Sequence, residues 1–407
     1  MKLKKFTAVS LTVAMTVTAL TGCGSEEKEK DSGKSSGKEV SAESFSDALE
    51  KGSKIENYDY KADIKVSVKG DELFAGAGEE IDGVLDTLGI SSDEISLTLS
   101  MDGSVKGTDA QKMTLGFEMG SLSGDITDIV YAEDTLYVNV AKAVDMVEQV
   151  ADKFGMKDEI STYVTLLPEG DYISVSKDTL TEVYDSILSS SGISAAEIES
   201  TDTEALTQAV YYLMDEVEKA AKNAEGVYSS KDGYSISVNQ DNVLSFIGAG
   251  ISVFAEDGDE IIRNLETITG DLGVSAEDAM NSMGIGSEED MNKVMEELES
   301  SREEIPDFDF NMTTDYSGTE GAAVWTFGYE MKFNAEGIDM TMSVNTEITE
   351  NSDVKVKVPE SVMDQEDVEA LLSMMGINSV DDIMGTLDEG TETPYNMEDD
   401  FDYDDTL

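Results

Sequence analysis

The sequence predicts an α+β fold built on one large antiparallel sheet, with helical insertions packed on one of its faces. Apolar and polar residues alternate over many short segments, which is typical of strands with one buried and one solvated face. Other segments repeat their apolar residues every three or four positions, which indicates amphipathic helices. The chain has 407 residues, of which 40% are hydrophobic, so it can bury a sizeable core.

The alternating pattern predicts roughly ten or eleven strands. It is longest at 58–68, 308–316, 323–333 and 338–348. Shorter strands are predicted at 95–101, 113–119, 129–131, 136–140, 172–175, 234–238 and 354–358. Tight turns that suit hairpins are predicted at 101–103 and 335–337, where an acidic residue precedes glycine.

Helices are predicted before and between these strands. A short helix at 45–51 precedes the first strand, and amphipathic helices are expected at 180–188 and 206–221. The uncharged segment 243–255 is too short to span a bilayer and is predicted to be a buried helix. After the last strand, residues 361–388 are predicted to form a small helical pair.

Residues 1–22 are typical of an export signal, because lysines precede an apolar run that is shorter than the roughly 18 residues of a membrane span. The last residues of this segment are Leu20, Thr21 and Gly22, and they are followed by Cys23, the only cysteine of the chain. This end resembles the lipobox of bacterial lipoprotein signal peptides. The resemblance implies a diacylglyceryl group on Cys23, cleavage before it, and a lipid-anchored protein on the extracytoplasmic face of the cell membrane. An ordinary secretory signal with a chance cysteine is the alternative.

Two segments outside the sheet have compositions unsuited to a core. Residues 23–41, the lipidated cysteine and a stretch rich in Gly, Ser, Lys and Glu, are predicted to be a flexible tether. Residues 389–407 are acidic and contain no base, which predicts a disordered tail. The folded domain is therefore expected at 42–360, followed by the helical pair.

The order of these features resembles the LolA/LppX-like lipoproteins. After the lipobox and tether come strand phrases at 57–60, 129–140 and 232–238 and a closing phrase at 356–359. The resemblance covers about residues 42–360 and implies that the sheet is a strongly curved half-barrel with helices against its concave side. That family carries lipids or lipoproteins in the concavity. The helical insertions between 142 and 225 and between 241 and 302 depart from the family pattern.

Composition excludes several classes of function. The chain has no histidine, so a Ser-His-Asp triad, an H-E-x-x-H zinc site and an imidazole base are all excluded. We expect no enzyme activity, no metal site and no cofactor. A net charge of -61 would repel nucleic-acid phosphates, so nucleic-acid binding is not expected.

Two functions remain open. The first is a binding or carrier lipoprotein that holds an apolar ligand against the apolar face of the sheet. The second is a structural or interaction lipoprotein whose sheet is plugged by its own helices, with a protein partner that the sequence does not identify. The expected cavity wall consists of Leu97, Leu99, Met101, Met113, Phe117, Trp325, Phe327, Met331, Met340 and Met342.

Overall fold

The fold is known from a computed structural model that describes residues 38–70, 79–165, 170–177, 203–269, 306–335 and 337–364, together with 179, 293, 295, 296, 299, 300 and 366–368. The export signal, the lipobox and the acidic tail lie outside the described residues. So do the predicted helix at 180–188 and most of the predicted helical pair.

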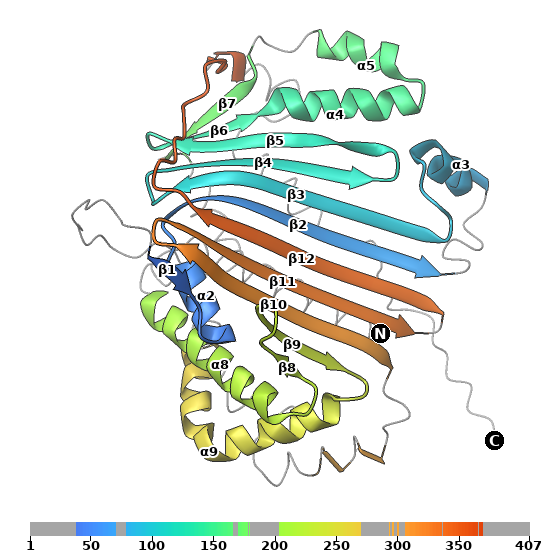
Figure 1. The fold of residues 1–407 in the computed structure, drawn as a ribbon. Coiled ribbons are helices and arrows are strands. Elements are labelled where there is room, and N and C mark those ends of the chain that lie inside the picture. Colours follow the sequence, from blue (N-terminus) through green and yellow to red (C-terminus); the bar gives the residue numbers. More distant parts are fainter. Residues whose placement is uncertain are drawn as a thin grey trace, which may run out of the picture.

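The described residues form an open, curved antiparallel sheet of twelve strands with helices, which confirms the α+β prediction (Figure 1). The strand order is β7-β6-β5-β4-β3-β2-β12-β11-β10-β9-β8, and β1 pairs with the part of β10 that β9 leaves free. The strands are β1 (Glu39–Ser41), β2 (Asn57–Gly70), β3 (Glu94–Lys106), β4 (Ala110–Met119), β5 (Leu122–Ala132), β6 (Thr135–Asn139), β7 (Tyr172–Ser176), β8 (Tyr228–Ser229), β9 (Tyr234–Asn239), β10 (Asp307–Thr319), β11 (Ala322–Ala335) and β12 (Ile338–Glu350).

The sheet consists of two meanders joined along one seam. Strands β2 to β7 follow one another in sequence and in space, and so do β8 to β12. The seam is the long antiparallel ladder between β2 and β12, in which Tyr58 pairs with Glu350 and Gly70 with Ile338. The sheet also begins before the expected boundary at residue 42, because Glu39–Ser41 pair with β10.

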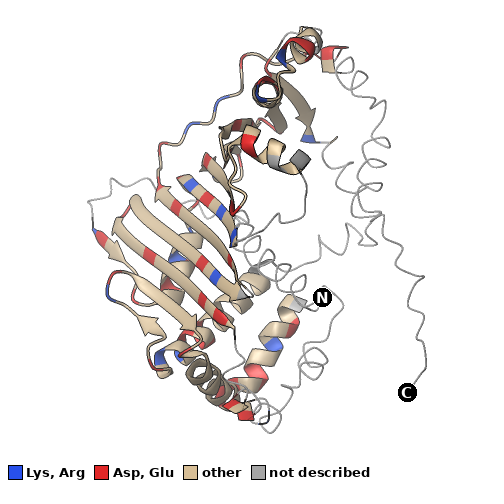
Figure 2. Ribbon diagram, turned by 90° about the vertical axis from the view of Figure 1, so that its right-hand side faces the viewer, with Lys and Arg blue, Asp and Glu red and all other residues tan. Residues whose placement is uncertain are grey.

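Most helices gather at the two ends of the sheet, whereas α3 lies beside the right-hand ends of the middle strands in Figure 1 (Figures 1 and 2). At one end α2 packs on β10 and β11, α8 packs on α2, and α9 packs on α8. At the other end α4 packs on β5 and α5 packs on α4. The helices are α2 (Phe45–Ser53), α3 (Glu79–Leu88), α4 (Val140–Lys153), α5 (Lys157–Val164), α8 (Thr203–Asn223) and α9 (Val243–Thr269).

Helix α9 is longer and less buried than predicted. It continues past residue 255 through a kink at Asp257, whose φ of -120° and ψ of 16° are not helical. Within 243–255 only Val253 is buried, and the remaining side chains are half-buried or exposed. Helix α9 packs on α8 and β9.

The predicted strand at 354–358 is wrong. These residues alternate valine and lysine, but they make no ladder, because β12 is already paired on both sides with β11 and β2. The chain instead crosses to the far edge of the sheet, where the Asp171 and Tyr172 amides donate to Ser361 O and the Met363 amide donates to Tyr172 O.

The predicted turn at 101–103 is also wrong, whereas the turn at 335–337 is confirmed by the pairing of Ala335 with Ile338. Gly103 lies inside β3, where a Cβ atom would overlap the carbonyl oxygen of Lys112 and the ring of Tyr60. Glycine is therefore needed here for close approach. The turn between β3 and β4 follows at Gly107, which has a φ of +49°.

Candidate functional site

Alternate, mostly apolar residues of β2, β3, β4, β10, β11 and β12 lie on one face of the sheet and form rows across it. One row crosses six strands, and each member is paired with the next: Phe310, Met331, Met342, Val66, Leu97 and Met119. A neighbouring row contains Met312, Tyr329, Val344, Ile64, Leu99 and Phe117. All ten predicted wall residues lie on this face, so the alternation gave their orientation correctly.

The face has a covered end, which we define as the buried cluster Tyr58, Trp325, Phe327, Tyr329, Val344 and Ile348. Helix α2 lies directly on it, since a Cβ atom at Gly52 would overlap the Trp325 indole. Trp325 is 3% exposed, and its Nε1 donates to Thr314 Oγ1 over 2.9 Å. The buried indole is therefore satisfied, and Trp325 and Phe327 are closed off by the chain itself.

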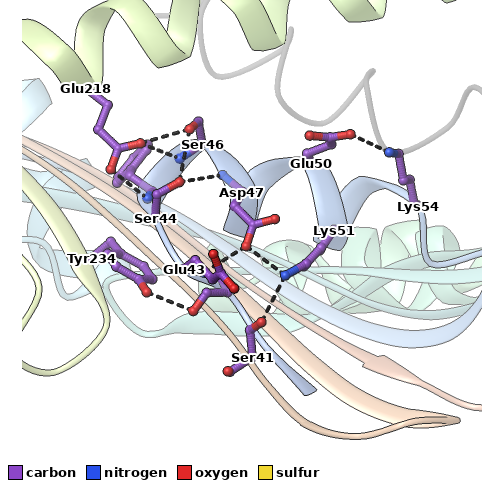
Figure 3. Close-up of polar contacts among 12 residues, drawn as sticks. Ser41, Glu43, Ser44, Ser46, Asp47, Glu50, Lys51, Lys54, Glu218 and Tyr234 are labelled. Atoms are coloured by element: carbon purple, nitrogen blue, oxygen red, sulfur yellow. Dashed lines mark hydrogen bonds and ion pairs between the residues drawn. The ribbon is translucent and has the colours of Figure 1, made fainter.

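Helix α2 is held in place by a buried carboxylate from α8 (Figure 3). Glu218 accepts hydrogen bonds from the amides of Phe45 and Ser46 at 3.0 Å each and from the Tyr228 hydroxyl at 2.8 Å. Lys222 Nζ lies 2.9 Å from the same carboxylate. Burial alone would raise the pKa of Glu218, but these donors together lower it to about 2. An ionised carboxylate thus binds the amides at the start of α2, which have no acceptor within the helix.

Further polar contacts fix the segment that leads into α2 (Figure 3). Ser44 Oγ accepts from the Asp47 amide at 3.2 Å, which is a normal helix N-cap. The Tyr234 hydroxyl donates to Ala42 O at 2.8 Å, and Lys51 Nζ donates to Ser41 O at 2.9 Å. The strand β1, the linker and α2 are therefore attached to the sheet as one unit.

The rest of the face is a half-exposed end, which we define as the eight other predicted wall residues. None of them is buried and none is fully exposed: Leu97, Leu99, Met101, Met113, Phe117, Met331, Met340 and Met342. They lie on β3, β4, β11 and β12. Wall residues at the two ends are therefore on one surface but in two environments.

A hollow lies over the opposite, polar face of the sheet. It measures about 330 Å³ and spans β12, β2, β3 and β4. Its lining includes both charges and hydroxyl groups: Asp59, Lys61, Asp102, Ser104, Lys112, Thr114, Glu347 and Thr349. Ser104 Oγ donates to Asp59 Oδ1 over 2.5 Å at its floor. This hollow does not match the apolar cavity expected from the sequence.

Sequence reasoning missed Glu218 and most of the residues that build the covered end. Glu218 precedes Lys222 by one helical turn, and such a pair is usually solvated, so only its distant partners Phe45 and Ser46 reveal its role. Tyr329, Val344 and Ile348 carry the same alternation as the predicted wall. Their burial depends on α2, which the pattern does not place.

Among the described residues, no acidic or cysteine side chains are grouped as metal ligands, and no helix is long and apolar enough to cross a bilayer. Comparison of the chain with family models, with curated proteins and with solved structures finds no match.

Proposed function

We propose that the protein is a non-catalytic binding lipoprotein, anchored to the extracytoplasmic face of a bacterial membrane through Cys23, that takes an apolar ligand on the half-exposed end of its sheet. The ligand class that fits is a lipid acyl chain. Its long, flexible hydrocarbon matches a surface of aliphatic, methionine and phenylalanine side chains.

The observation that supports the proposal is the incomplete burial of a continuous apolar surface. The row from Phe310 to Met119 is half-buried along all six strands. With neighbouring strands about 4.8 Å apart, such a row is about 24 Å long. Partly exposed apolar surface of this extent favours binding of an apolar partner. Methionine adapts to partners of variable shape, and this row contains three.

The covered end favours a second function, that of a structural or interaction lipoprotein in which the chain's own helices fill the apolar face of the sheet. There α2 occupies the apolar face, and Trp325 is sealed beneath it. The same kind of cover extended over the half-exposed end would leave no room for a ligand. The two functions therefore differ in one property, which is whether the half-exposed end accepts a ligand from solution.

The experiment is lipid extraction from the mature protein purified from membranes in mild detergent, followed by mass spectrometry and by binding of a radiolabelled fatty acid. Leu99→Gln should reduce bound lipid several-fold, because it places an amide in the apolar row. Thr98→Gln is the matched control, since neighbouring residues of a strand face opposite sides. No lipid in the parent protein, or equal loss in both variants, would favour the plugged function.

The anchor is tested separately. Intact mass should show a mature chain that starts at Cys23 and carries an added lipid mass, and Cys23→Ser should abolish both lipidation and membrane retention. A mature chain without added mass would reject the lipoprotein part of the proposal and leave the ligand part standing.

A further inference from the structure

Three methionines meet on neighbouring strands at the half-exposed end. Met331 on β11 is directly opposite Met342 on β12, and Met340 lies two residues before Met342 on the same face. Directly opposite Cβ atoms are about 5 Å apart, and diagonal neighbours about 7 Å. Methionine side chains are long and unbranched, so three sulfur atoms at these positions can converge on one point above the sheet.

We propose that Met331, Met340 and Met342 form a binding site for one soft monovalent metal ion, Cu(I) or Ag(I). Thioether sulfur is a soft, neutral ligand that selects Cu(I) over the hard cations held by carboxylates. The chain has no histidine and one cysteine, so methionine supplies nearly all of its soft ligands. The site is distinct from the acyl-chain proposal in its chemistry, although both use the same end of the face.

The surroundings of the three methionines suit such an ion. Phe310 is paired with Met331 and Phe333 with Met340, so aromatic rings border the site. The Tyr329 hydroxyl donates to Met331 Sδ over 3.6 Å, which places this sulfur on the side of the apolar face. Lys332, Thr341 and Ser343, which follow the three methionines in sequence, alternate to the polar face, so their side chains point away from the sulfur atoms.

The three methionines are less buried than the cluster of the covered end, against whose edge Met331 and Met342 pack. The six buried residues of the covered end include no methionine, whereas Met331, Met340 and Met342 are all half-buried. The site requires no rearrangement of the strands, because the ladder between β11 and β12 already sets the spacing.

The test uses Ag(I), which has no redox chemistry under these conditions, with the full chain carrying Cys23→Ser so that no thiol competes. Native mass spectrometry and calorimetry in nitrate buffer with excess Mg²⁺, which occupies carboxylates, should show one bound Ag(I) per chain. The triple variant Met331→Leu/Met340→Leu/Met342→Leu should bind at least tenfold more weakly. Leucine keeps the apolar volume, so circular dichroism should be unchanged.

The control variant is Met101→Leu/Met113→Leu/Met119→Leu, which changes three methionines of the same face that have no methionine directly opposite. It should retain Ag(I) affinity. The proposal is overturned if the parent protein binds no Ag(I), if the first triple variant retains its affinity, or if both variants lose it equally. These results are read from metal binding and those of the lipid experiment from extracted lipid, so failure of one proposal can be told from failure of the other.

Discussion

The two ends of the apolar face carry the same sequence pattern and lie on shared strands, yet one is sealed and the other is half-exposed. Trp325 and Met331 are six residues apart on β11 and face the same side. Trp325 is sealed under α2, while Met331 is only half-buried. The difference shows that period-2 alternation determines which face of the sheet a side chain lies on. Whether the side chain is buried depends on the helix that packs on that face.

The comparison also separates two uses of side-chain chemistry. The covered end consists of aromatic and β-branched residues, whose side chains have few rotamers, and the Trp325 indole is hydrogen-bonded to Thr314. The half-exposed end is rich in methionine, which changes its packing at low cost. Stability should therefore depend mainly on the first, and binding on the second.

The largest expected effect is at Trp325. Trp325→Ala should lower the free energy of unfolding by about 4 kcal/mol, because it leaves a cavity beneath α2 and an unpaired Thr314 hydroxyl. Met342→Ala at the half-exposed end should lower the free energy of unfolding by only about 1 kcal/mol, because the Met342 side chain is half-buried and buries less apolar area on folding than Trp325 does. Urea denaturation measures both. Equal losses would mean that the two ends are equally buried in solution.

Glu218 should give the next largest effect, and it depends on pH. Its pKa falls from 4.5 in the ordinary state to about 2, so its contribution to stability is present above pH 4.5 and is lost as the pH falls toward 2. The shift corresponds to about 3 kcal/mol. Glu218→Gln should therefore destabilise the protein by about that amount at pH 6 and by little at pH 2.

The control for Glu218 is Glu330→Gln, because Glu330 is paired with Lys332 on the exposed face. It should change stability by less than about 0.5 kcal/mol at either pH. Chemical denaturation of both variants at pH 6 and pH 2 is the measurement. A Glu218→Gln effect that stays constant between these pH values would rule out the ionised carboxylate as the group that holds α2.

A smaller effect is expected from adding one methyl group beneath α2. Gly52→Ala should cost about 2 kcal/mol, because the new Cβ would overlap the Trp325 indole. Gly250→Ala in α9, where a Cβ meets nothing within 4 Å, should be neutral or slightly stabilising. Thermal unfolding compares the two. If Gly52→Ala were as harmless as Gly250→Ala, α2 would not press on the sheet in solution.

The smallest effect is expected at the half-exposed end itself. Met331→Leu conserves volume and polarity, so it should change the unfolding free energy by less than about 1 kcal/mol. Calorimetric unfolding in the absence of metal is the measurement. A loss comparable to that of Trp325→Ala would show that Met331 is locked in a core, and the division of the face into two ends would then be wrong.

Much of the sheet could be predicted from sequence because its strands are long and alternate strictly. The short strands β1 and β8 were not predicted, because three and two residues are too few to show an alternating pattern. Glu39–Ser41 also have the composition of the adjoining tether. The error at 354–358 was the opposite one, because a strand was predicted there and none is formed. The valines at these positions alternate well, but a strand also needs a neighbour with an unpaired edge, and none is available beside β12.

The candidate site was predictable only in part, for a related reason. The direction of every wall residue followed from its place in a strand, whereas the cover over Trp325 and Phe327 depends on α2, which is anchored by a carboxylate more than 160 residues away in sequence. Contacts of this range leave no local pattern. The hollow on the polar face likewise arises from four strands together and has no signature in any one of them.

The seam between β2 and β12 determines the order in which the molecule can fold. Every other ladder in the two meanders, that of β9 with β10 included, joins strands closer in sequence than β2 and β12. The seam closes a loop of roughly 280 residues, which costs about 3 kcal/mol more in chain entropy than a ten-residue hairpin. Each meander should therefore form its hairpins first, and the two halves should zip together last. Pulse-labelling hydrogen exchange should protect the β3–β4 and β10–β11 amides before those of the seam.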